Sequence, residues 1–176
     1  MSKITIKKIS ITDITADAIV NAANSYLAPG GGVCGAIYEK AGYEQLLAAC
    51  RKIGRCKTGD AVITDGFQTN AKYIIHAVGP IWSGGNDKEP ELLYGCYKAS
   101  LQLARENQCR SVAFPLISAG IYGYPQDQAW RVALQACDDF LKDNPEYDID
   151  IIFTILSDRI IQSGYNAMQV LDIPVD

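Results

Sequence analysis

Short apolar runs alternate with longer amphipathic segments along this chain of 176 residues. Six runs have the length and apolar content of buried strands, and four of the other segments carry apolar residues at helical spacing. Strands that alternate with helices need crossover connections of about a dozen residues or more, which make the strands parallel and place helices on both faces of the sheet. We therefore expect one domain over residues 1–176, of the α/β class, with three layers and a mixed, mostly parallel central sheet. The expected strands span 4–9, 18–23, 61–64, 73–78, 111–117 and 149–156, and the expected helices span 33–53, 89–106, 126–142 and 158–170.

Hydrophobic residues make up 48% of the chain and are spread evenly, so no window reaches the apolar length that a membrane-spanning helix requires. The first ten residues, MSKITIKKIS, contain neither an apolar run nor a cleavage signal. We expect a cytoplasmic protein with no membrane partner, which acts as a monomer.

The cysteines fall mostly inside the expected helices and strands, which favours reduced thiols over a disulfide framework. No two of them form a CxxC pair, and the chain has a single histidine. A zinc site would have to be assembled from scattered thiols, so we predict no metal and no cofactor. The six cysteines are Cys34, Cys50, Cys56, Cys96, Cys109 and Cys137.

The formal net charge of −4 and the isoelectric point near 5.0 disfavour binding of duplex nucleic acid through a broad basic face. We expect no nucleic-acid partner. Any phosphate-bearing ligand should be small and held locally.

Residues 21–37, NAANSYLAPGGGVCGAI, run from an apolar strand through three consecutive glycines into a helix. Glycines let backbone N–H groups approach an anion, and the first turn of a helix adds unpaired donors and the positive end of its dipole. This pattern fits a phosphate-binding loop. Taken alone, it fits a flexible surface connection equally well.

A second segment, residues 118–125 (SAGIYGYP), repeats the arrangement of strand, glycine loop and helix. In an open parallel sheet, ligands bind outside the carboxyl ends of the strands, where two such loops can close on one ligand. Tyr122 and Tyr124 would offer flat apolar surface to a sugar or a base. The alternative is that both rings cap the edge of the sheet.

Three other motifs are weaker. Gly30, Gly32 and Gly35 satisfy GxGxxG, but the stretch between strand and glycines is too long for a dinucleotide turn. Ser118 lacks the first glycine of a nucleophile elbow, and no histidine is placed to serve it. His76 lies within an apolar strand, where a hydrogen-bonded structural role is favoured over that of a catalytic base.

Polar side chains accompany the two loops. Asn21 and Asn24 bracket two alanines directly after a strand, and Asp13 lies in the turn after the first strand. Each has an ordinary interpretation, a loop-closing hydrogen bond for the asparagines and a turn cap for Asp13. The ordered set of aspartate, asparagine and two glycine loops is a stronger signal than any of its members.

In this order, these segments resemble the macrodomains, which bind ADP-ribose. The resemblance covers nearly the whole chain and implies a three-layer macrodomain fold. It rests on 12–15 (TDIT), 17–24 (DAIVNAAN), 30–33 (GGGV), 73–80 and 114–125.

The resemblance also implies roles for single residues. Asp13 matches the aspartate that accepts a hydrogen bond from the adenine amino group, Asn24 the asparagine at the distal ribose, and Val33 the residue whose backbone meets a phosphate. The implied ligand-binding residues are Asp13, Ile14, Asn24, Gly30, Gly31, Gly32, Val33, Ser118, Ala119, Gly120, Ile121 and Tyr122.

One departure concerns catalysis. MacroD-type hydrolases carry an aspartate after GGGV and a histidine in the following helix, and here these positions are Cys34 and Tyr38. A thiol is not an equivalent base. The pattern GVC-x-A-[IV]-Y is nevertheless similar to that of alphavirus macrodomains, which include active hydrolases. Cys34 fits a small packing residue better than a covalent nucleophile. The expected catalytic centre comprises Asn24, Gly32, Cys34 and Tyr122.

The resemblance implies an ADP-ribosyl hydrolase, which removes mono-ADP-ribose from acidic side chains of proteins, deacetylates O-acetyl-ADP-ribose, or does both. Its partners would be ADP-ribose derivatives and mono-ADP-ribosylated proteins. The alternative is a non-catalytic module that binds ADP-ribose, and a third interpretation is RNA or poly(A) binding in the adenine pocket, against which the acidic isoelectric point argues.

Overall fold

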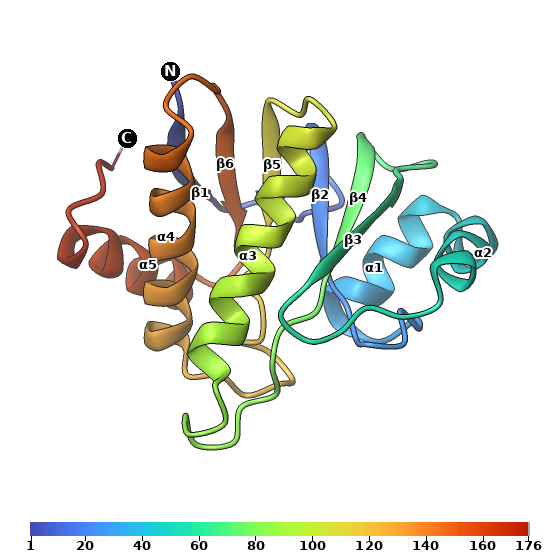
Figure 1. The fold of residues 1–176 in the computed structure, drawn as a ribbon, viewed down its shortest axis with the longest axis horizontal. Coiled ribbons are helices and arrows are strands. Elements are labelled where there is room, and N and C mark those ends of the chain that lie inside the picture. The colour runs from blue at the N-terminus through green and yellow to red at the C-terminus, as the bar shows by residue number, and fades with distance from the viewer. Residues whose placement is uncertain (176) are drawn as a thin grey trace.

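A six-stranded sheet forms the middle layer of the protein, with strand order β1-β6-β5-β2-β4-β3 (Figure 1). The computed structural model describes residues 1–175. Five neighbouring strands, β1, β6, β5, β2 and β4, are mutually parallel, and β3 runs antiparallel to β4 at one edge. The expected mixed, mostly parallel sheet is confirmed. The strands are β1 (Lys3–Lys7), β2 (Ala16–Ala22), β3 (Ala61–Asp65), β4 (Ala71–Ala77), β5 (Ser111–Phe114) and β6 (Asp150–Thr154).

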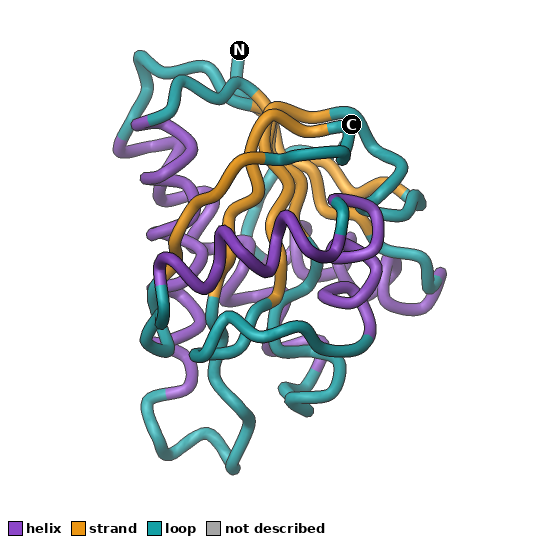
Figure 2. The backbone as a smooth tube through the Cα atoms, turned by 90° about the vertical axis from the view of Figure 1, so that its right-hand side faces the viewer, coloured by secondary structure: helices purple, strands orange, loops and turns teal. Residues whose placement is uncertain are grey.

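Helices cover both faces of this sheet (Figures 1 and 2). Because successive strand residues point to opposite faces, Val20 packs into the cluster under α3 and α4, whereas Ile19 packs into the cluster under α1 and α2. Helix α5 packs against α4 beside the edge strand β1. The three-layer arrangement is confirmed. The helices are α1 (Gly32–Ala41), α2 (Tyr43–Ile53), α3 (Glu89–Glu106), α4 (Gln126–Asp143) and α5 (Asp158–Val170).

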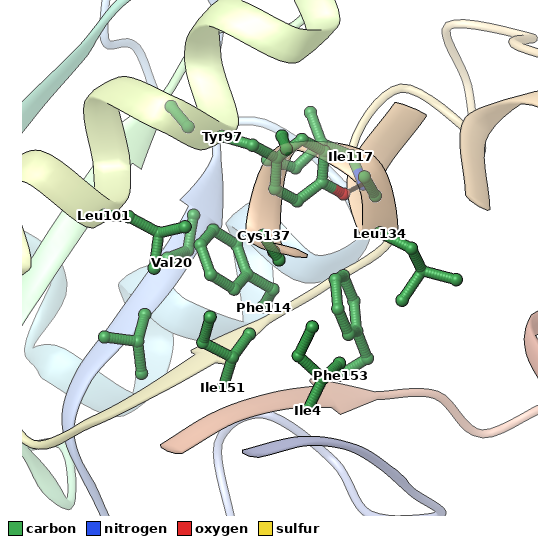
Figure 3. Packing of buried hydrophobic residues seen from close by; sticks show 14 of the residues in the cluster. Ile4, Val20, Tyr97, Leu101, Phe114, Ile117, Leu134, Cys137, Ile151 and Phe153 are labelled. Atoms are coloured by element: carbon green, nitrogen blue, oxygen red, sulfur yellow. Dashed lines mark hydrogen bonds between the residues drawn. The ribbon is translucent and has the colours of Figure 1, made fainter. Parts of the chain in front are cut away.

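The larger core cluster contains an aromatic group between the sheet and the helices α3 and α4 (Figure 3). The ring of Phe114 lies 5.1 Å from that of Tyr97 and 5.7 Å from that of Phe153. The hydroxyl of Tyr97, although buried, accepts the backbone N–H of Ile117 at 2.9 Å and donates to the carbonyl of Pro115 at 3.3 Å. These two bonds fix the chain where β5 ends and the second glycine loop begins.

One expected helix and the carboxyl ends of three expected strands differ clearly from the structure. The single helix expected over 33–53 is broken into α1 and α2 at Gly42, whose φ of +101° is a conformation that other residues rarely adopt. Strand β5 ends at Phe114 rather than at 117, where its pairing with β6 stops, and β1 and β6 end at Lys7 and Thr154 rather than at 9 and 156. The helices expected over 89–106 and 158–170 are confirmed. Within residues 1–175, no helix is both long and apolar enough to cross a membrane.

Candidate functional site

A cavity of about 660 Å³ opens where the parallel strands β1, β2, β5 and β6 end. Both glycine loops line it, together with the segments that follow β1 and β6. The two loops expected from the sequence to share one ligand therefore face the same space. The expected site residues that line it are Asn24, Gly30, Gly31, Gly32, Val33, Cys34, Ser118, Gly120, Ile121 and Tyr122.

Three expected ligand residues lie outside this lining. Asp13 is exposed in the turn after β1, and Ile14 is buried in the core cluster beneath α1 and α2. Ala119 lines a separate hollow, together with residues 123–127. Tyr124, for which ligand contact was expected, is 2% exposed and packs its ring 4.7 Å from that of Trp82. Of the two loop tyrosines, Tyr122 lines the cavity.

The apolar end of the cavity was not fully anticipated from the sequence. Residues 9–11, which follow β1, and 154–157, which follow β6, line it together with Ile160 of α5. Leu156 is 64% exposed at the rim. Their positions at the carboxyl ends of parallel strands are the signal that could have identified them.

The first loop is closed by the side chain of Asn24. Its Oδ1 accepts the backbone N–H groups of Tyr26 at 3.1 Å and Ala28 at 3.0 Å, and its Nδ2 donates to the Ala28 carbonyl at 3.0 Å. Both lone pairs of Oδ1 are therefore used, whereas the second N–H of Nδ2 remains able to donate. In the part of the chain that the structure describes, Asn24 can offer a ligand a donor but no acceptor.

Helix α1 begins at the glycines in a way that favours an anion. Gly32 has a φ of +58°, and no acidic residue lies in the first turn, whose N–H groups have no partner within the helix. A Cβ on Gly35 would lie 2.7 Å from the carbonyl oxygen of Gly30, so only glycine permits this close packing. The buried hydroxyl of Tyr38 donates to the Leu27 carbonyl at 2.9 Å and so ties α1 to the first glycine loop.

A buried chain of hydrogen bonds lies beneath this loop. Thr64 donates its hydroxyl proton to the Asp65 carbonyl, so the 3.0 Å contact between Thr64 and His76 Nε2 requires that Nε2 carry a proton. His76 Nδ1 is then an acceptor, and Asn21 Nδ2 donates to it at 3.1 Å. Burial lowers the pKa of His76 to about 4, which keeps the ring neutral. The structural role expected for His76 is confirmed.

The same chain reaches Cys34. Asn21 Nδ2 also lies 3.7 Å from the Cys34 sulfur, which in turn lies 3.9 Å from the Ala28 carbonyl. Burial raises the pKa of the Cys34 thiol, and the hydrogen bond from Asn21 offsets this only in part. A protonated thiol that is 7% exposed is suited to packing rather than to attack or proton abstraction.

The second loop is held by contacts with the segment that follows β4. Ser118, at a φ of +68°, donates its hydroxyl to the Pro80 carbonyl at 2.7 Å. The backbone N–H of Trp82 donates to the Tyr122 carbonyl at 2.8 Å, and the Trp82 ring packs on Tyr124. Three contacts thus fix residues 118–124 to residues 80–82.

Residues 83–89 are organised in turn by one carboxylate. Glu89, 1% exposed, accepts the backbone N–H groups of Ser83 at 2.9 Å, Gly85 at 2.8 Å and Asp87 at 2.6 Å. Burial alone would raise the pKa of Glu89, but these hydrogen bonds outweigh it and lower the pKa to about 2. Glu89 therefore stays ionised and holds the loop that supports the second glycine loop.

The cavity lining has an unusual electrostatic character. Within residues 1–175, it contains no aspartate, glutamate, histidine, lysine or arginine, and its titratable side chains are Cys34 and Tyr122. An anion bound here would be neutralised by backbone N–H groups and by the dipole of α1 rather than by cations. The described residues contain no group of three His, Cys, Asp or Glu placed to hold a metal ion.

The chain matches the family model described as "Macro domain" over residues 20–133 and belongs to this family. An O-acetyl-ADP-ribose deacetylase from Cronobacter sakazakii is 51% identical over 140 residues, which cover 77% of each chain. The ADP-ribose glycohydrolase MACROD2 from Xenopus laevis is 49% identical over 156 residues, which cover 87% of this chain and 37% of that longer protein.

Solved macrodomain structures share the fold. The Oceanobacillus iheyensis macrodomain with ADP superposes with a TM-score of 0.89 at 39% identity, over 95% of this chain and 90% of that one. The Trypanosoma brucei macrodomain in complex with ADP-ribose gives a TM-score of 0.87 at 35% identity, over 94% of this chain and 68% of that one.

Proposed function

We propose that this protein binds ADP-ribose and hydrolyses mono-ADP-ribose from acidic side chains of proteins, and that it also deacetylates O-acetyl-ADP-ribose. The observation that carries the proposal is the cavity between the two glycine loops, which offers backbone donors and no charged side chain. The names of the two enzyme relatives and the nucleotide ligands of the two solved macrodomains support it.

The geometry suggests how the ligand lies. The diphosphate would occupy the space between Gly30–Val33 and Ser118–Tyr122, above the N-terminus of α1. The adenine would lie at the apolar end beside Leu156; Asp13 itself lies outside the cavity lining. The distal ribose would then lie beside Asn24, between Gly32 and the ring of Tyr122.

Hydrolysis in such a site would depend on positioning. A water molecule attacks the anomeric carbon of the distal ribose, the bond to the carboxylate oxygen of the modified side chain breaks, and the water proton passes to a phosphate oxygen of the ligand. Because both lone pairs of Asn24 Oδ1 are occupied, Asn24 would orient the ribose or the water by donating its free N–H.

Acidic linkages suit this site better than linkages to nitrogen. The leaving group is a carboxylate, which is stable at neutral pH because the pKa of aspartate and glutamate is about 4. It departs without a proton from the enzyme, and in residues 1–175 the cavity lining offers no carboxylic acid or histidine to supply one. Gly32, Cys34 and Tyr122 would then shape the centre rather than transfer protons.

The second candidate function is a non-catalytic ADP-ribose reader. It is favoured by Cys34, which has a raised pKa and occupies the position of the aspartate in MacroD-type hydrolases. A reader would bind ADP-ribose with micromolar affinity and release none from a modified protein.

Release of ADP-ribose from a glutamate-modified and from an arginine-modified protein, measured over many turnovers, tests the proposal. We expect release from the first and none from the second. Asn24→Asp keeps the two hydrogen bonds that Oδ1 accepts but loses both N–H groups of Nδ2, the one bonded to the Ala28 carbonyl and the free one. It should lower kcat by about 100-fold. Binding of free ADP-ribose without any release would establish the reader.

The Cys34→Asp and Cys34→Ser pair separates the two functions further. If the native site is a complete hydrolase, neither variant should exceed the wild-type rate, because Cys34 only packs the start of α1. A large gain in rate for Cys34→Asp, absent from Cys34→Ser, would instead show that the native chain is a reader that lacks its base.

A further inference from the structure

A group of basic residues stands out on a chain whose net charge is −4. Residues 51–57 (RKIGRCK) contain four of the sixteen lysines and arginines and no acidic residue. All four basic side chains are exposed, and none of them belongs to an ion pair in the part of the chain that the structure describes. We call this group the basic patch; it comprises Arg51, Lys52, Arg55 and Lys57.

Part of the basic patch has an ordinary explanation. Arg51 and Lys52 lie in the last turn of α2, where positive charge stabilises the carboxyl end of a helix. Arg55 and Lys57 lie beyond this helix and have no such role. Asp60 is the acidic residue that follows them, and its carboxylate accepts the backbone N–H of Ala61 at 2.8 Å.

The basic patch is joined to the wall of the ligand cavity. The guanidinium of Arg55 lies 4.5 Å from the centre of the Tyr26 ring, and the backbone N–H of Cys56 donates to the Ser25 carbonyl at 2.9 Å. Tyr26 and Ser25 belong to the first loop, directly after Asn24, which lines the cavity. Arg55 is therefore held against the loop residues that directly follow Asn24, beside which the distal ribose would lie.

From this placement we infer that the basic patch binds the acidic protein segment that carries the ADP-ribose. The inference rests on the proposed function, because the modified side chain leaves the cavity at the distal ribose. An aspartate or glutamate flanked by further acidic residues would bring negative charge next to Arg55 and Lys57. The surface thereby selects modified sites in acidic sequence surroundings.

A nucleic acid is a poorer occupant of the same surface. A phosphate backbone requires a basic stripe of several contacts along its length, and affinity for it depends on the number of phosphates neutralised. The basic patch is short and belongs to an acidic chain with an isoelectric point near 5.0. An acidic peptide segment carries only a few negative charges, which the four basic side chains of the patch are enough to pair.

The test compares two synthetic peptides, each ADP-ribosylated on one glutamate, with either acidic or neutral flanking residues. The variant is Arg55→Glu/Lys57→Glu, and its matched control is Lys3→Glu/Arg131→Glu, which reverses two exposed charges on β1 and α4. The readouts are kcat/KM for each peptide and the Kd for free ADP-ribose.

The expected result is a fall in kcat/KM of about tenfold for the acidic peptide in Arg55→Glu/Lys57→Glu. The neutral peptide, the Kd for free ADP-ribose and the control variant should change by less than about twofold. Because exposed charges are screened, the effect should shrink in about 0.5 M salt.

Equal kcat/KM losses for both peptides, or none for either, would overturn the inference. So would an unchanged acidic peptide together with loss of binding to a single-stranded RNA, which would assign the basic patch to nucleic acid. If the wild-type protein released no ADP-ribose from any peptide, the proposed hydrolysis would fail; binding of the unhydrolysed acidic peptide, measured against its neutral counterpart, would still test the basic patch.

Discussion

The two glycine loops face the same cavity but are held in different ways. The first loop is held mainly by residues that are close to it in sequence, through Asn24, Cys34 and Tyr38, and by the buried side chain of Asn21. One longer-range backbone bond, from Cys56 to Ser25, adds to these contacts. The second loop is held across some 40 residues of chain, with Ser118 bonded to Pro80. The first loop is thus a local structure on a buried polar support, whereas the second depends on the packing of a distant segment.

The largest expected effect comes from Gly35→Ala, which should break the first loop alone. The added Cβ would meet the backbone carbonyl of Gly30 at 2.7 Å, and a backbone atom cannot move aside cheaply. We expect the free energy of unfolding to fall by roughly 3 kcal/mol, measured by urea denaturation, with loss of ADP-ribose binding.

Gly31→Ala is the matched control for Gly35→Ala. A Cβ on Gly31 meets no atom within 4 Å, and its φ of −88° suits any residue. The free energy of unfolding should stay within about 0.5 kcal/mol of wild type. Equal losses in both variants would mean that the close packing of Gly35 is unimportant.

The second largest effect concerns the buried hydrogen-bonded chain of Thr64, His76 and Asn21 beneath the first loop. The pKa of His76 is about 4 in the folded protein and about 6.5 when unfolded, so the unfolded chain binds the proton more readily. The contribution of the neutral His76 to the free energy of unfolding is complete above about pH 6.5 and is lost as pH falls toward 4. Between pH 7 and pH 5, the free energy of unfolding should drop by about 2 kcal/mol.

Urea denaturation of the His76→Gln variant at the same pH values provides the comparison. Glutamine does not titrate, so the slope of stability against pH over this interval should flatten even though the variant is less stable at pH 7. A slope as steep as that of the wild type would assign the acid sensitivity to other groups.

The smallest effect should come from Ser118→Ala in the second loop. It removes one buried hydrogen bond, to Pro80, and should cost about 1 kcal/mol. Ser118→Gly loses the same bond but relieves the φ of +68°, so it should be the less destabilised of the two. Hydrogen exchange should rise in residues 118–124 and stay unchanged in 24–34; an equal rise in both loops would contradict their independence.

The difference between the locally held first loop and the second loop, held by a distant segment, also explains which features could be predicted from the sequence. The alternation of strands and helices, both glycine loops and the structural role of His76 depend on local patterns. The break between α1 and α2 was missed because Gly42 lies within a continuous helical pattern. A glycine inside such a pattern does not reveal whether the helix will bend there.

The support of the second loop could not be predicted from the sequence. The contacts of Ser118 with Pro80 and of Trp82 with Tyr124 join residues whose proximity is set by the completed sheet. A loop also lacks the periodicity that would show which of Tyr122 and Tyr124 faces the cavity. That Asp13 lies outside the cavity lining could not be predicted for the same reason.

The buried imidazole has a spectroscopic consequence. His76 is the only histidine of the chain, so a proton–nitrogen NMR spectrum of the side chain should contain one imidazole spin system, with its proton on Nε2. Since Asn21 links this ring to Cys34 beneath the first loop, the chemical shift of Nδ1 should report when the cavity fills. The protein therefore carries a built-in probe of occupancy that needs no attached reporter group and never touches the ligand.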